Sequence, residues 1–177
     1  MLDYSSIEMA KNRASVMLLE AGIAITKKEF ADMEIADFGL NDLESQGLEI
    51  IVYENNDRYY AKELVLFPHQ TCPEHRHPSR DDIQGKMETF RCRWGKAFLY
   101  ISGEPTQSIQ ATIPGGSESY YTVFHEIELN PGDQFTIPSD TLHWFQGGPD
   151  GAIVSEFSSA SHDESDIFTD PNIKRVG

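Results

Sequence analysis

Three histidines and one glutamate in the chain have the types and spacing of ligands for a single metal ion. His75 and His77 are separated by one residue, and in a strand this spacing turns both imidazoles to the same face. Glu88 follows His77 eleven residues later, after a turn-rich stretch, and His143 shares its strand face with Phe145. Neutral imidazoles and a carboxylate are ligands for a divalent cation. We therefore predict one cation bound by His75, His77, Glu88 and His143.

The argument for Glu88 comes from its neighbours in the same predicted strand. Phe90 and Cys92 alternate with it, and a carboxylate among such residues is costly to bury unless it is paired or bound to metal. Glu74 competes with it by proximity to the histidines, but alternation turns Glu74 away from the face of His75. The set contains no thiolate and leaves open positions. This favours manganese, iron, cobalt or zinc in a reactive site over a closed structural zinc site.

These ligands need strands to carry them, and the sequence is β-rich over about residues 48–157. About eight short runs, among them LEIIVYE and KAFLYIS, are separated by Gly, Pro, Asn and Asp. This pattern predicts an antiparallel sandwich or barrel. The tail over residues 158–177 has no sheet period, so we expect a loop there. No linker or repeat divides the chain, and we predict a single domain over residues 1–177.

A helical segment over about residues 5–36 is predicted to precede the strands. Apolar residues recur at helical spacing in its first half, and Ser5 with Glu8 has the pattern of a capping box. Gly22 can end this helix in a left-handed conformation. The pattern Thr26–Glu29 repeats the capping box and predicts a second, short helix.

The charge of the chain argues against two classes of partner. Fourteen basic and twenty-nine acidic side chains give a formal charge of −15, which repels nucleic-acid phosphates and anionic lipids. The first residues have no signal-peptide pattern, and no apolar run approaches a membrane span. We therefore expect a cytoplasmic protein without nucleic-acid or membrane partners. Cys72 and Cys92 form no zinc-type cluster, and we interpret both as packing residues.

Two segments around the predicted ligands resemble the motifs of the cupin superfamily. HRHPSRDDIQGKMETFRCRWG resembles the first motif, which has an HxH pair, a later Glu and a Gly six residues beyond it. PGDQFTIPSDTLHWF resembles the second motif, with PxDxxH where cupins usually have PxGxxH. The gap between His77 and Glu88 is longer than the usual one. The resemblance implies a mainly β, single-domain cupin, an antiparallel β-barrel or jelly roll with N-terminal helices.

Longer segments over about residues 14–173 are similar to the D-lyxose ketol-isomerase family. They include NNDRYYAKELVLFPHQTCPEHRHP, YTVFHEIELNPGDQFTIPSDTLHWFQ and SEFSSASHDESDIFTDPNI. The resemblance implies a metal-dependent aldose–ketose isomerase, usually with manganese, that interconverts D-lyxose and D-xylulose, with D-mannose to D-fructose as a second activity. It also implies a homodimer and a small-molecule sugar as substrate.

An isomerase of this kind needs a base that moves a proton between C2 and C1. Glu156 alternates with Ala152 and Val154, and we predict that it is this base. Lys62 alternates with apolar residues and can stabilise an oxyanion or a sugar hydroxyl in the same cavity, although a lysine can also extend to a barrel rim. Asp166 resembles a family acid that relays protons or orients the sugar. Its rivals in the tail are Asp163 and Asp170.

Two other kinds of function fit the same ligands. Three histidines and one glutamate can hold Fe²⁺ for oxygen activation, as in a cupin dioxygenase. A non-catalytic sugar-binding cupin is the other alternative, in which the metal only fixes a ligand or stabilises the barrel. Burial of Glu156 and Lys62 would argue against this second alternative.

Overall fold

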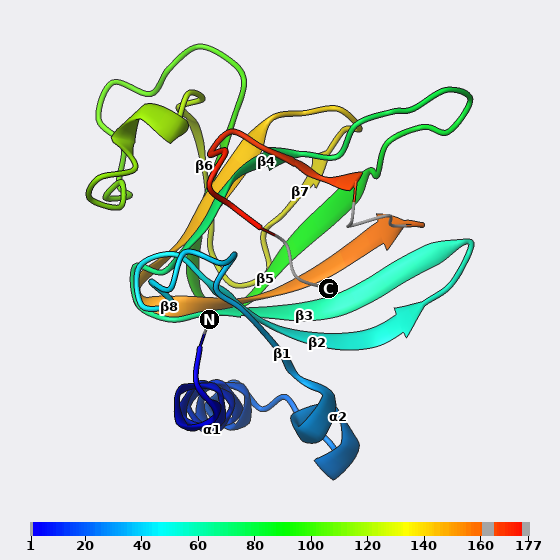
Figure 1. Ribbon diagram of the computed structural model, residues 1–177, viewed down its shortest axis with the longest axis vertical. Helices are drawn as coiled ribbons and strands as arrows, with labels where there is room; N and C mark the ends of the chain where they lie inside the picture. Colours follow the sequence, from blue (N-terminus) through cyan, green and yellow to red (C-terminus); the bar gives the residue numbers. More distant parts are fainter. Residues whose placement is uncertain (1, 161–164, 175–177) are drawn as a thin grey trace.

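The computed structural model describes residues 2–160 and 165–174, and its strands form one curled antiparallel sheet (Figure 1). The helices are α1 (Tyr4–Glu20), α2 (Lys27–Asp32) and the short 3₁₀ helix η1 (Glu118–Tyr120). The strands are β1 (Glu34–Ala36), β2 (Leu48–Asn55), β3 (Tyr59–Leu66), β4 (Thr71–Arg76), β5 (Glu88–Ile101), β6 (His125–Leu129), β7 (Gln134–Ile137), β8 (His143–Ser159) and β9 (Ile167–Phe168).

Two long strands join the layers of this sheet into a barrel. The strand order is β1-β2-β3-β8-β4-β9, and β5 pairs with β6, β7 and β8, always antiparallel. The first part of β8 lies between β4 and β5, and its last part lies between β3 and β5. Figure 1 shows β5 and β8 running from one layer into the other. The predicted mainly β, cupin-like barrel with N-terminal helices is confirmed.

The main core fills the space between the two layers. It includes inward-facing residues of β2, β3, β5 and β8, with Cys72 of β4 beside them: Leu48, Ile50, Leu64, Leu66, Phe90, Cys92, Leu99, Phe145 and Val154. Both cysteines are buried, as expected for packing residues. Each large apolar side chain buried in this way contributes about 1.5–3 kcal/mol to folding.

The outer face of the β2-β3-β8 layer is covered by α1. Ala10, Ala14 and Leu18 lie one turn apart on the helix and pack with Val65 and Ile153 of the sheet. In Figure 1 both helices lie on the side of this layer away from the barrel interior. No helix of the described residues is long and apolar enough to cross a membrane.

The helical segment differs from the prediction at both of its ends. The N-cap of α1 is Asp3, whose carboxylate accepts from the backbone N–H of Ser6 at 2.8 Å, so the predicted Ser5 cap is wrong. Gly22 has φ +72° after α1, and the capping box of Thr26 with Glu29 is present. Residues 34–36 are strand β1 rather than helix, because their backbone groups pair with β2.

Strand boundaries also differ from the sequence pattern. The runs METFRCRW and KAFLYIS are one strand, β5, and LHWFQ with GAIVSEF are one strand, β8. The sequence pattern suggests a break near Gly95, but the strand continues there with register shifts in its pairing to β8. The tail, where a loop was expected, contains the two-residue strand β9, which pairs with β4 through His75 and Phe168.

Candidate metal centre and active site

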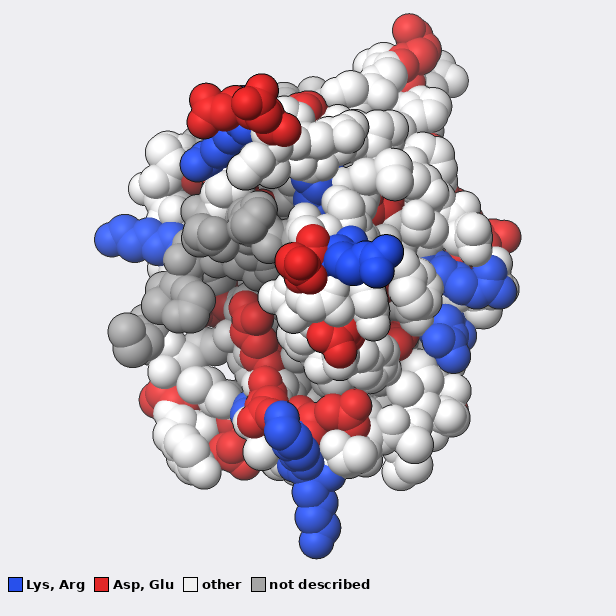
Figure 2. Space-filling model, turned by 90° about the vertical axis from the view of Figure 1, so that its right-hand side faces the viewer, with Lys and Arg blue, Asp and Glu red and all other residues white. Residues whose placement is uncertain are grey.

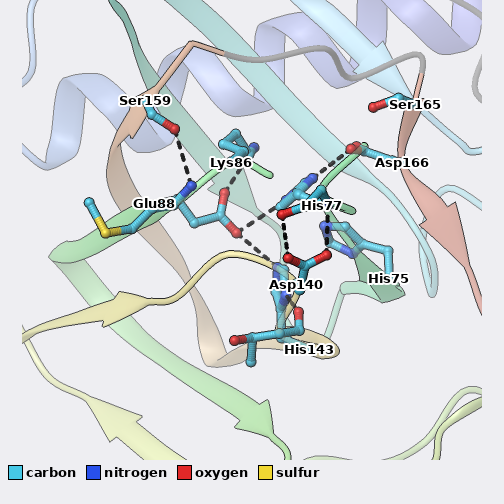
Figure 3. Close-up of polar contacts among 12 residues, drawn as sticks. His75, His77, Lys86, Glu88, Asp140, His143, Ser159, Ser165 and Asp166 are labelled. Atoms are coloured by element: carbon cyan, nitrogen blue, oxygen red, sulfur yellow. Dashed lines mark hydrogen bonds and ion pairs between the residues drawn. The ribbon is translucent and has the colours of Figure 1, made fainter. Parts of the chain in front are cut away.

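The three predicted histidine ligands lie together inside the barrel. His75 on β4 and His143 at the start of β8 are directly opposite each other in the sheet, and His77 follows the end of β4. One ring nitrogen from each histidine lies within 4.8 Å of the others, and all three residues are buried. Figure 3 shows the three rings turned toward one another.

Each histidine is fixed by a contact on Nδ1. His75 Nδ1 is 2.8 Å from the carbonyl oxygen of Pro73, and His143 Nδ1 is 2.9 Å from that of Thr141. The Nδ1 atom of His77 lies 2.5 Å from a carboxylate oxygen of Asp166. When Nδ1–H donates to each of these oxygens, the neutral ring has its lone pair on Nε2. Metal-ligating histidines are commonly oriented in this way.

Glu88 points its carboxylate at the same place. Its Oε1 atom lies 2.9 Å from His143 Nε2 and 3.3 Å from His77 Nε2. These three atoms are buried and have no hydrogen-bond partner of acceptable geometry in the described part of the chain. When both imidazoles are neutral, lone pairs that face each other so closely need a positive charge between them, either a proton on His77 or a metal ion. Ligand atoms about 2.1 Å from one ion are roughly 3 Å apart, so these residues fit a metal.

The electrostatics of the cluster favour positive charge at its centre. Burial raises the pKa of Glu88, but Lys86 and His77 hold it well below its usual range. Burial lowers the pKa of His77, but Glu88 and Asp166 raise it to about 9 overall. Burial and the two neighbouring imidazoles hold the pKa of His75 well below the usual value, which keeps this ring neutral.

Glu74, the competing carboxylate, faces away from the cluster and has another function in the fold. Its side chain accepts from the N–H groups of Thr122 and Val123 at 2.6 and 3.0 Å. It also accepts from the hydroxyls of Thr122 and Thr169 at 2.8 and 2.7 Å. Glu74 is therefore satisfied as a structural carboxylate that fixes the segment carrying β9 to β4.

A second buried carboxylate, Glu156 of β8, lies between two lysines. Lys62, directly opposite it on β3, is 3.1 Å from Oε2, and Lys86 is 3.1 Å from Oε1. Lys86 also lies 2.9 Å from Glu88 Oε2 (Figure 3) and therefore links the two carboxylates. Glu156 is 2 % exposed and Lys62 is 5 % exposed, so neither is a charge at a strand end or rim.

Lys86 is a site residue that sequence reasoning missed. It precedes β5 in a stretch rich in turn residues, and for this reason it was not assigned to the strand. A signal was present, because Lys86 continues backward the alternation that groups Glu88 with Phe90. A buried lysine two residues before a buried glutamate on the same face indicates a charge pair.

Of the two tail aspartates that the structure describes, Asp166 is the one beside a predicted ligand. Its side chain is 2 % exposed and contacts His77 across 89 residues of sequence. Asp170 instead accepts from the backbone N–H and the side-chain amide of Asn172 at 2.8 and 2.9 Å. Asp163 lies outside the described residues.

Two hollows adjoin the cluster and share His77 and Lys86. The inner cavity has a volume of about 20 Å³, and its lining includes Lys62, Glu88 and Glu156 together with apolar core residues. The outer pocket has a volume of about 200 Å³. Its lining residues are His77, Pro78, Arg80, Ile83, Gln84, Gly85, Lys86, Ala160, Ser165 and Asp166.

The fold and the site define a cupin with a candidate metal centre and a buried carboxylate, held between two lysines, beside it. The chain belongs to the D-lyxose isomerase family, since the model of that family matches residues 22–177. It is 64 % identical to the D-lyxose ketol-isomerase of Cohnella laeviribosi over 94 % of this chain and 92 % of the relative. It is 61 % identical to the D-lyxose/D-mannose isomerase of Thermosediminibacter oceani over 99 % and 97 % of the two chains.

Solved structures with a similar fold have much lower sequence identity. The ligand-free L-ribose isomerase of Cellulomonas parahominis has a TM-score of 0.82 at 16 % identity, covering 98 % of this chain and 95 % of its own. The L-ribose isomerase of Acinetobacter sp. DL28 in complex with L-ribose has a TM-score of 0.80 at 17 % identity, covering 97 % and 94 %. At this identity the likeness establishes the fold.

Proposed function

We propose that the chain is a D-lyxose ketol-isomerase that binds Mn²⁺ through His75, His77, Glu88 and His143. The observation that carries the proposal is the convergence of the four side chains next to a buried carboxylate held by two ammonium groups. Three of their ligand atoms, on His77, Glu88 and His143, have no hydrogen-bond partner among the described residues. Family membership and the named activities of the relatives support D-lyxose as a substrate, and D-mannose as a second one.

The metal, when bound, would polarise the sugar oxygens at C1 and C2 and thereby acidify the C2 proton. Glu156 is the proposed base that carries this proton between C2 and C1. The two lysines at 3.1 Å fix the direction of its carboxylate. Lys62 is also suited to donate to the oxygen on which negative charge develops.

Asp166 acts in this proposal through a metal ligand. Its carboxylate holds the His77 ring by Nδ1, so that Nε2 faces Glu88 and the other histidines. A positioning residue of this kind preserves the geometry of the ligand set during turnover. Iron, cobalt and zinc also suit these ligand types, and manganese is proposed on the family resemblance.

Three further parts of the proposal concern the protein in the cell. We propose that residues 1–177 form one cupin domain, that two copies form a homodimer, and that the protein works in the cytoplasm on a free sugar. On the face of the molecule shown in Figure 2, basic side chains lie next to acidic ones. This mixture suits an uncharged sugar.

The test is ketose formation by metal-stripped protein restored with Mn²⁺, measured under nitrogen with D-lyxose and D-mannose. We expect D-xylulose and D-fructose, and a loss of at least about 100-fold in Glu156→Gln, the usual value of a general base. Bound metal must be equal in both proteins. Glu128→Gln, at a partly exposed glutamate on β6, is the matched control.

Two outcomes would contradict the proposal. If metal binds but neither sugar yields a ketose, the isomerase assignment fails, and oxygen uptake with Fe²⁺ becomes the next measurement. If Glu156→Gln retains full activity with metal bound, the isomerase assignment stands and another residue is the base.

A further inference from the structure

The inner cavity can accept only a small part of an open-chain sugar. Its volume of about 20 Å³ holds about one water molecule. Beyond the charged groups its lining is apolar, with Phe38, Leu48, Ile50, Leu64, Phe90, Phe145 and Phe168. A polyol pushed in this direction would bury hydroxyls without partners, at a cost of about 1–3 kcal/mol for each.

The outer pocket is an order of magnitude larger and has polar groups of the kind that bind hydroxyls. In Figure 3, Lys86, Asp166 and Ser165 lie on one side of the ligand set and His143 on the other. Arg80 and Gln84 line the same pocket, where Gln84 is exposed. If the first two oxygens of a sugar reach the ligands, the rest of its chain therefore has polar partners only on the side of the outer pocket.

We propose that this outer pocket is the subsite for the distal hydroxyls of an open-chain aldose, with Arg80 and Gln84 as its specificity-determining residues. This inference rests on the proposed isomerase function. The reactive end, C1 and C2, lies at the ligand set, and the chain from C4 onward lies in the outer pocket. The orientation follows from the opposite polarity of the two hollows.

The backbone of the subsite is held in place before any ligand binds. The N–H of Arg80 donates to the carbonyl oxygen of Ile83 at 2.9 Å, and the N–H of Ile83 donates back at 2.8 Å. The guanidinium of Arg80 donates to the carbonyl oxygen of Ser165 at 3.0 Å. Since a guanidinium carries five N–H groups, Arg80 can keep this bond and donate to a sugar hydroxyl as well.

The volume of the pocket bears on substrate length. The inner cavity fixes the position of the reactive carbons, but the outer pocket has room for an additional hydroxymethyl group. D-mannose has the configuration of D-lyxose at C2, C3 and C4 and one more carbon. L-erythrose has the same configuration at C2 and C3 and ends at C4. The subsite therefore predicts that the sugar gains contacts with the outer pocket as its chain lengthens from L-erythrose to D-lyxose and D-mannose.

The first experiment compares kcat/KM for L-erythrose, D-lyxose and D-mannose in Mn²⁺-loaded wild type, Arg80→Ala and Gln84→Ala. We expect the ratio of kcat/KM for D-mannose to kcat/KM for L-erythrose to fall about tenfold in Arg80→Ala and less in Gln84→Ala. This is the size of effect that the loss of one hydrogen bond gives. The control Arg91→Ala removes an exposed arginine of β5 that contacts Gln134. A ratio within twofold of the wild type in both pocket variants would overturn the inference.

The second experiment needs no turnover and separates this inference from the isomerase proposal. Binding of D-mannitol and D-arabitol, unreactive open-chain polyols, is measured by calorimetry in the metal-loaded proteins. We expect weaker binding in Arg80→Ala and unchanged binding in Arg91→Ala. Ketose formation with no effect of the pocket variants on polyol binding overturns the subsite alone. Polyol binding that depends on Arg80 without any ketose formation overturns the isomerase and keeps the subsite.

Discussion

Removal of the Asp166 carboxylate is expected to weaken metal binding without removing any ligand. Asp166 lies 2.5 Å from His77 Nδ1, and both side chains are less than 10 % exposed. A short, charge-assisted hydrogen bond of this kind is worth about 1.5–3 kcal/mol. If that free energy holds the His77 ring in its binding orientation, Asp166→Ala lowers Mn²⁺ affinity by roughly 10–100-fold. Asp166→Asn should lose less, because an amide oxygen can still accept from Nδ1.

The assay is competition for Mn²⁺ against a chelator of known affinity, and it does not depend on turnover. Asp170→Asn is the matched control, since that buried tail carboxylate contacts Asn172 instead of a predicted ligand. Affinity within twofold of the wild type in Asp166→Ala would refute the reasoning. An equal loss in Asp170→Asn would also refute it, since general loosening of the tail would then explain the effect.

Three other substitutions are tested by urea unfolding without metal, two beside the site and one at Glu49, a buried carboxylate on the other face of β2. Lys86→Met leaves two buried carboxylates without their shared cation and should lower the free energy of unfolding by about 3–5 kcal/mol. Lys96→Met, at a partly exposed ion pair, should lower it by less than about 1 kcal/mol. Gly85→Ala places a Cβ 2.2 Å from a backbone oxygen and should cost about 3 kcal/mol, whereas Gly115→Ala meets nothing within 4 Å. Burial raises the pKa of Glu49 from 4.5 to about 8, so stability falls as pH rises from about 4.5 to about 8. Between about pH 5 and about pH 9, the free energy of unfolding of Glu49→Gln should therefore fall by about 4 kcal/mol less than that of the wild type. The same pH dependence in both proteins would contradict this prediction.

Alternation along strands was sufficient to group the ligand candidates. The histidine pair lies at the end of β4, Glu88 begins β5 and His143 begins β8. In each case a period of two fixes the face of the side chain before the partner strand is known. The same rule grouped Glu156 with apolar neighbours, and the structure buries it opposite Lys62.

Residues outside regular strands could not be found in this way. Asp166 reaches His77 because the two residues of β9 pair with β4, a contact between distant segments that no local period reveals. Lys86 lies before the first residue of β5. Breaks were predicted where glycine and proline interrupt the runs of β5 and β8, but register shifts carry both strands through.

The departure of the second motif from PxGxxH has a physical explanation. Asp140, at the position of the usual glycine, has φ +61°, a left-handed conformation that Asp tolerates better than most residues. Its carboxylate accepts from the N–H and the hydroxyl of Ser79 at 2.7 and 2.5 Å. Aspartate therefore keeps the turn and also ties the loop after His77 to the strand that carries His143 (Figure 3).

The balance of buried charge explains why the site needs a cation and how it can favour an anionic intermediate. Glu88, Glu156 and Asp166 provide three carboxylates, and Lys62 and Lys86 provide two ammonium groups. With these five groups ionised and the three imidazoles neutral, as metal ligation requires, one formal negative charge is left uncompensated, which is costly in a buried site. A bound divalent cation would change this to one positive charge. That charge would stabilise the oxyanion formed when the C2 proton passes to Glu156, a transfer that leaves the total charge of the site unchanged. Removal of either lysine shifts that balance toward repulsion of the intermediate, so both lysines are expected to affect turnover through charge as well as through packing.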